Sequence, residues 1–151
     1  MQHKEFALHR AAKLYDIPDI LQIGWLDDRH DFRTGAVPPK FMQKLQTLMR
    51  MPIKAPDHGL SCRLCSQSGT LHQCLEYWLR NHDGKIFVAP GLIYHHINQH
   101  QYCPPEPYID AVLRIGAFFK KSQIMSPKDV ADFIRPFAKK HSLRIGKGLG
   151  V

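Results

Sequence analysis

The chain has 151 residues, of which 44% are apolar and 23% are charged. That length suits one domain of about 100–200 residues, and the composition excludes a disordered tail, a collagen and a coiled coil. The net charge of +8 favours acidic partners, and the segment 126–151, with six basic and two acidic side chains, contributes half of it.

Two helices separated by a loop are expected in the N-terminal third. Residues 3–15 have helical spacing, and Pro18 ends that helix because the residue before a proline avoids the helical region. A short apolar stretch over 20–23 leads into a loop over 24–37. The second helix covers roughly 39–50, where one apolar stripe contains Phe41, Leu45, Leu48 and Met49.

The middle of the chain predicts a β-hairpin followed by a helix. Residues 71–80 alternate in polarity as a strand does, and residues 85–89 form the return strand. The turn between them ends at Gly84, which suits a positive φ. Residues 92–100 have helical spacing and stop before Cys103-Pro104-Pro105.

Two further helices are expected in the C-terminal third. One covers about 107–121 and ends in Lys120-Lys121, whose charges suit the negative end of a helix dipole. The other begins at Ser126-Pro127, a favourable cap followed by a favourable first residue. Its buried face contains Val130, Phe133, Ile134 and Phe137.

The sequence suggests a cytoplasmic protein. The first twenty residues contain six charged side chains, which is unlike a secretory signal. No stretch approaches the 18 apolar residues of a membrane span, so we expect no membrane partner. Because cytosolic thiols stay reduced, we interpret the cysteines as ligands or core thiols; they are Cys62, Cys65, Cys74 and Cys103.

A pattern of cysteines and histidines predicts a zinc site. Cys62-x2-Cys65 is followed after 29 residues by His95-x4-His100. Such pairs provide the two thiolates and two imidazoles of a tetrahedral zinc centre, and the order knuckle, hairpin and helix is that of a ββα zinc finger. The long spacer is no obstacle, because closing a loop costs only about 0.6 kcal/mol per doubling of its length.

The identity of the third and fourth ligands stays open on spacing alone. His96 and His100 lie about 40° apart around an ideal helix, whereas His95 and His100 lie about 140° apart and need a loosened last turn. Cys103, just beyond the helix, could replace either histidine. If no metal binds, the two cysteines of the knuckle are core thiols or a redox pair.

Three motifs resemble those of an uncharacterised family of small, largely actinobacterial proteins. The first family motif, W-L-D-x-x-H-x-F, matches Trp25 to Phe32, and the second is the C-x-x-C of Cys62 and Cys65. The third runs H-Y-V-x-x-H-x-Y-x-P-P and matches His95 to Pro105, although His96 stands where the family has tyrosine. The resemblance covers about residues 24–118 and implies His95, rather than His96, as a zinc ligand.

Two other groups of residues are candidates for function. Asp27 and His30 follow Trp25 in a loop and could orient a zinc-binding histidine through hydrogen bonds, or form a second metal site or an acid–base pair. Lys139, Lys140, Arg144 and Lys147 could contact the phosphates of a nucleic acid. Alternatively, these groups are a capped loop and a solvated helix end.

The sequence therefore predicts an α+β protein with one zinc-bound hairpin and helix, packed against about four further helices. We expect a single domain over 1–151, with an N-terminal helical extension (1–23), a zinc-binding core (24–121) and a basic C-terminal helix and tail (122–151). Four protein ligands leave no open metal position for a substrate, so we expect a non-enzymatic binding module, an adaptor or immunity-type protein. A nucleic-acid-binding protein is the alternative, and a ββα metal nuclease is a weaker one.

Overall fold

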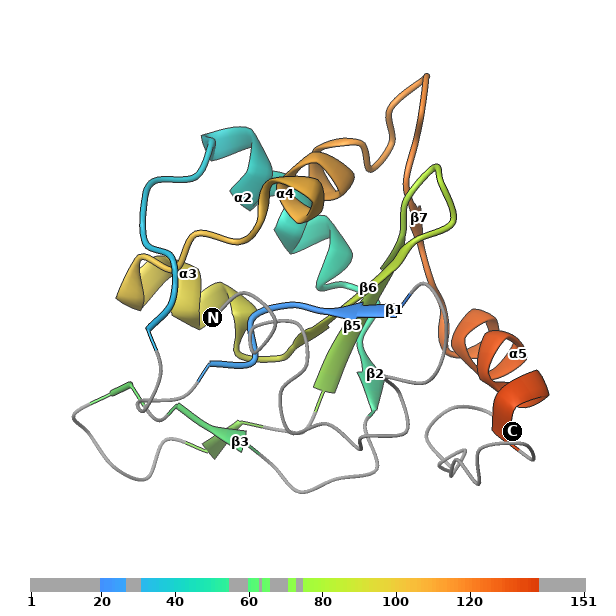
Figure 1. The fold of residues 1–151 in the computed structure, drawn as a ribbon, viewed down its shortest axis with the longest axis horizontal. Helices are drawn as coiled ribbons and strands as arrows, with labels where there is room; N and C mark the ends of the chain where they lie inside the picture. The colour runs from blue at the N-terminus through green and yellow to red at the C-terminus, as the bar shows by residue number, and fades with distance from the viewer. Residues whose placement is uncertain are drawn as a thin grey trace.

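A five-stranded mixed sheet forms the centre of the computed structural model (Figure 1), which describes residues 20–26, 31–54, 60–62, 64–65, 71–72 and 75–138. β5 (Leu75–Arg80) and β6 (Ile86–Pro90) form the hairpin that the sequence predicts. The side-chain Oδ1 of Asn81 closes its turn by accepting the backbone N–H groups of Asp83 and Lys85.

Further strands flank this hairpin on both sides. β1 (Ile20–Gln22) runs parallel to β6, with Ile20 opposite Ile86. On the other edge, β2 (Ile53–Lys54) and β7 (Gln123–Ile124) pair with the two ends of β5. The hairpin is therefore the interior of a sheet rather than the free hairpin of a zinc finger, and the ββα finger arrangement is not confirmed.

The two faces of the hairpin are both buried. Tyr77 and Leu79 point into one core cluster with Phe87, whereas Trp78 points into a second cluster with Val88 on the opposite face. All residues from Glu76 to Leu79 are buried, so neither face of this part of the strand is open to water.

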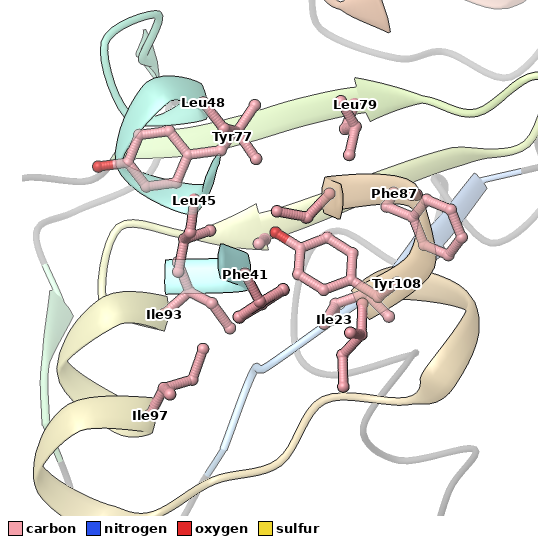
Figure 2. Packing of buried hydrophobic residues seen from close by; sticks show 14 of the residues in the cluster. Ile23, Phe41, Leu45, Leu48, Tyr77, Leu79, Phe87, Ile93, Ile97 and Tyr108 are labelled. Carbon is pink, nitrogen blue, oxygen red and sulfur yellow. The ribbon is translucent and has the colours of Figure 1, made fainter. Parts of the chain in front are cut away.

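The four helices within the described residues lie on opposite faces of the sheet (Figure 1). α2 (Pro39–Leu48), α3 (Ile93–His100) and α4 (Glu106–Leu113) cover the face of Tyr77, and Figure 2 shows their apolar side chains meeting there. α5 (Pro127–Ala138) packs on the face of Trp78. None of the described helices is long and apolar enough to cross a membrane. The helix expected over 3–15 lies outside the described residues.

Helix α4 is shorter than the expected 107–121. Its end is fixed by hydrogen bonds: the Ala111 carbonyl accepts the Ser122 hydroxyl at 2.6 Å, and the Arg114 carbonyl accepts the backbone N–H of Ser122. Gly116 then has a φ of +76°, which a right-handed helix cannot contain. Residues 116–121 therefore form a connecting loop, and Lys120-Lys121 does not end a helix.

A reciprocal pair of hydrogen bonds fixes the start of α5. The Ser126 hydroxyl accepts the Asp129 backbone N–H at 3.1 Å, while the Asp129 carboxylate accepts the Ser126 backbone N–H at 2.9 Å. This is a capping box with aspartate in the place of glutamate. It confirms the helix start predicted from Ser126-Pro127.

We predict that a side chain at Gly24 would clash with Ile93 and that a smaller residue at position 93 would relieve the clash. Gly24 has a φ of +78°, and a Cβ there would lie 2.5 Å from Ile93 Cδ1. Gly24→Ala should lower the free energy of unfolding by about 2–4 kcal/mol, from backbone strain and overpacking together. Ile93→Val removes Cδ1, so the double variant should be more stable than the sum of the two changes by at least about 0.5 kcal/mol. If urea unfolding showed that the stability losses of the two single variants simply add in the double variant, the predicted clash would be contradicted.

A second prediction concerns the acid dependence of the capping box. The bond from the Ser126 backbone lowers the pKa of Asp129 below its ordinary value of 3.8. The ionised carboxylate therefore stabilises the fold above pH 3.8 and loses that contribution as the pH falls through its native pKa. Urea unfolding should show that Asp129→Ala is less stable than wild type by about 1 kcal/mol near neutral pH, with the difference shrinking below pH 3.8. Ser126→Ala, which removes no ionisable group, is the control and should keep more of its deficit in acid.

Candidate metal centre

Four side chains from two separate elements converge at one place. Cys62 and Cys65 lie in the loop that follows β3 (Leu60–Ser61), and His95 and His100 lie on α3. One sulfur or nitrogen from each residue lies within 4.8 Å of all the others, so the four could bind a single metal ion. These are the residues that the cysteine–histidine pattern and the family resemblance select.

The distances between sulfur and nitrogen suit a shared ion. Cys65 Sγ lies 3.1 Å from His95 Nε2 and 3.5 Å from His100 Nε2, and Cys62 Sγ lies 3.5 Å from His100 Nε2. Bond lengths of about 2.3 Å to sulfur and 2.0 Å to nitrogen in a tetrahedron imply a sulfur–nitrogen separation of about 3.5 Å. The donor atoms therefore already have nearly the spacing that one tetrahedral ion requires.

A widened last turn in α3 brings the two histidines to the same side. The Gln101 backbone N–H donates to the His96 carbonyl, five residues back instead of the usual four, and Gln101 has a φ of +54°. Such a turn contains an extra residue, so His95 and His100 approach to a ring-centroid distance of 5.2 Å. The ideal-helix spacing that favours His96 is wrong for this turn, and the loosened turn that His95 requires is present.

The opposite side of α3 is held in the core. Ile93 and Ile97 are buried, and Figure 2 shows them projecting from the helix into the apolar cluster. Beyond the helix, Tyr102 forms an isolated bridge with Thr34, and Cys103 N–H donates to the Arg33 carbonyl. These contacts fix both the rotation of α3 and the path of the chain after His100.

The loop that contains the two cysteines follows a strand of a small second sheet. β3 pairs antiparallel with β4 (Leu71–His72), and this two-stranded sheet is separate from the central one. The single strand expected over 71–80 is instead two strands, because Leu71 pairs with Ser61 in the small sheet whereas Leu75 pairs with Lys54 in the central one. An isolated two-stranded sheet is marginally stable in water, so a link from its cysteines to α3 would contribute to holding it in place.

Electrostatics at the cysteine pair oppose two free thiolates. The pKa of Cys65 is raised above 9.0, first because burial disfavours its charged form and then because Cys62 lies beside it. A divalent cation between the two sulfurs reverses this balance by stabilising both thiolates. Two cysteine sulfurs and two histidine nitrogens are a donor set that fits a bound divalent cation.

The remaining predicted residues lie elsewhere or outside the described chain. His96 is buried, with its ring centroid 6.0 Å from that of His95, and it is not in the group. Cys103 lies buried beside Arg33, whose pKa its thiol raises together with Glu106, so it replaces neither histidine. Trp25 is buried and donates from Nε1 to the Val88 carbonyl. Outside the described residues are Asp27, His30, Cys74, Lys139, Lys140, Arg144 and Lys147.

We predict that His95, and not His96, is required for metal binding. His95→Ala should weaken Co²⁺ binding by more than the roughly 10–100-fold loss seen when only a hydrogen-bonding partner of a ligand is changed. His96→Gln should keep one ion per chain, because its ring lies outside the donor group. Titration of the Co²⁺ absorption bands checks both variants, and the reverse pattern would show that the widened turn does not select the ligand.

Comparison with known proteins gives one family match. Neither a curated protein nor a solved structure matches the chain. A family described as a domain of unknown function, DUF7919, matches residues 2–113. The matched range contains all four clustered donors and ends at Leu113, the last residue of α4. This range is well over half of the 151 residues, and the chain therefore belongs to the DUF7919 family.

Proposed function

We propose that the protein is a zinc-stabilised, non-enzymatic module that binds another protein. One observation carries the metal part of this proposal: four protein donors, two sulfurs and two nitrogens, lie within 4.8 Å of one another. Soft thiolates together with imidazoles favour Zn²⁺ over Mg²⁺ or Ca²⁺, which prefer oxygen ligands. Cys62, Cys65, His95 and His100 would hold the ion.

The role we propose for the ion is structural. A catalytic zinc keeps three protein ligands and an open position for water or substrate, whereas four protein donors fill a tetrahedron. The ion would tie the β3–β4 sheet to α3, and α3 is anchored in the core by Ile93 and Ile97. Zinc binding would in this way stabilise the surface around the cysteine loop.

The proposed binding role rests on the size and charge of the chain and on the proposal that four protein ligands fill every position of the metal. A basic chain of this length, with reduced thiols at Cys62, Cys65 and Cys103, suits an adaptor or immunity-type protein of the bacterial cytoplasm. Its partner would present an acidic face.

Nucleic-acid binding is the second candidate, favoured by the net charge of +8 and by the +4 of residues 126–151. Phosphate contacts depend chiefly on Arg and Lys. Residues 92–103, which include α3, contain neither Arg nor Lys, so this helix is poorly suited to enter a groove. An affinity for random duplex DNA that falls steeply with salt would favour this candidate over an acidic protein.

The metal and its role can be tested on the full chain purified without chelator. Elemental analysis should find about one zinc per chain in wild type and none in Cys62→Ser/Cys65→Ser. Removing the ion should lower the Tm by several degrees, because structural zinc in finger peptides contributes about 10–16 kcal/mol and part of that free energy stabilises the fold. Cys103→Ser, a buried thiol outside the group, is the matched control and should keep its zinc.

The same protein separates a structural from a catalytic ion. In the Co²⁺-substituted protein, azide or cyanide should leave the absorption spectrum unchanged, because no exchangeable position remains. A spectral shift with either anion, or metal-dependent nicking of plasmid DNA that the double cysteine variant lacks, would overturn the non-enzymatic proposal. Absence of metal in the wild-type protein would overturn the zinc proposal.

A further inference from the structure

The loop between α4 and β7 exposes two adjacent phenylalanines. Phe118 is 86% and Phe119 75% exposed, and Met51, at 40%, is the next large apolar residue on the described surface. Figure 1 shows this loop projecting beyond the helices at one end of the molecule. A contiguous apolar patch at a projecting position usually marks a contact site in a soluble protein.

Hydrogen bonds from α4 and α2 hold the base of the loop. The N–H groups of Ala117 and Ser122 donate to the Arg114 carbonyl, and the Phe119 carbonyl accepts from Arg114 Nη1. Lys44 Nζ donates to the Ile115 carbonyl at 2.6 Å. These bonds fix the base of the loop to α4 and α2, so the two rings are held at a defined place on the surface.

The charge around the two rings is positive. Lys120 and Lys121 follow Phe119 directly and are exposed, and residues 111–128 contain no acidic side chain. The neighbouring β5–β6 turn adds Lys85 and Asp83, which cancel each other. An anionic surface is therefore the complementary partner for this end of the molecule.

We propose that Phe118 and Phe119 insert into the interfacial region of an anionic lipid bilayer, while Lys120 and Lys121 contact the lipid phosphates. A convex tip needs no matching groove in a fluid bilayer, and long lysine side chains reach headgroups from a shallowly inserted loop. Such a peripheral contact needs no membrane-spanning segment, and the lack of one is the only ground on which the sequence predicts no membrane partner. The two rings pack edge to face, with centroids 4.6 Å apart, and so present no parallel faces on which successive bases could stack. Like charges on two tips would oppose pairing with a second copy.

This contact goes beyond the proposed zinc-dependent function and does not depend on it. The loop is anchored to α4 and α2 through Arg114 and Lys44, and neither element contributes a metal ligand. Lipid binding should therefore persist in Cys62→Ser/Cys65→Ser below the Tm of that variant. A wild-type protein that binds zinc but no lipid would contradict the lipid proposal alone.

Co-sedimentation of the full chain with sucrose-loaded vesicles tests the proposal. Wild type should bind phosphatidylcholine vesicles containing about 30 mol% phosphatidylserine roughly tenfold more tightly than phosphatidylcholine alone. Phe118→Ser/Phe119→Ser should lose roughly tenfold in affinity or more, and Lys120→Ser/Lys121→Ser should lose the preference for anionic lipid. The matched controls are Met51→Ser for apolar exposure and Lys128→Ser for charge, and both should bind as wild type does.

Because the substituted residues are exposed, the variants should keep the wild-type Tm. An unchanged affinity in Phe118→Ser/Phe119→Ser would overturn the proposal, since binding would then be purely electrostatic or occur elsewhere. A wild type that does not sediment would overturn it too. The proposal would likewise fail if the phenylalanine variant lost duplex DNA binding or dimerisation instead of vesicle binding.

A second variant reports insertion directly. Trp25 and Trp78 are buried, whereas position 119 is exposed. Phe119→Trp would therefore place an exposed indole at the tip of the loop. Its fluorescence should shift to the blue and become protected from iodide on adding anionic vesicles. Full access of iodide to the new indole in the vesicle-bound protein would show that the tip stays in water and would overturn the proposal.

Discussion

The candidate metal centre depends on the backbone turn that ends α3, in which the His96 carbonyl accepts the N–H groups of both Gln101 and Tyr102. With the usual spacing, His100 would rotate toward the side of α3 that carries Ile93 and Ile97. The helix would then either withdraw an isoleucine from the core or separate the two imidazoles. The extra residue in the last turn removes this conflict, because the histidines face the cysteines while the isoleucines stay packed.

That arrangement requires a firm support beneath α3, and the sheet provides it. Gly24 approaches Ile93 so closely that a methyl group would not fit, which holds the chain after β1 against the start of α3. At the other end of the helix, the pairing of Thr34 with Tyr102 and the edge-to-face contact of Phe32 with Tyr102 hold the exit. Phe32 therefore contributes packing at the end of α3, and no described residue of the Trp25–Phe32 segment belongs to the donor group.

Local signals predicted local structure, whereas non-local pairing was largely missed. The β5–β6 hairpin, α2, α3 and the capped start of α5 follow from turn residues, apolar spacing and caps within a few positions. The four clustered donors were also predicted, because the C-x2-C and histidine-pair spacings indicate metal ligands whatever the surrounding fold. Nothing near Leu71 indicates that it pairs with Ser61, or that β1 joins β6 from a distant part of the chain. The exposure of Phe118 and Phe119 was not predicted, because the sequence pattern placed both residues in a helix over 107–121. Gly116, with its positive φ, interrupts that helix.

The parallel pairing of β1 with β6 has a consequence for synthesis on the ribosome. Ile20 pairs with Ile86, so β1 leaves the ribosome long before its partner strand exists. At about 5–20 residues per second, the delay is roughly 3–13 s. During this time β1 lacks β6, its one partner in the described sheet, which makes it a natural binding segment for a chaperone on the nascent chain. The antiparallel partner β5, by contrast, precedes β6 directly, so the hairpin can form as soon as both strands emerge and then serve as the template on which β1 docks.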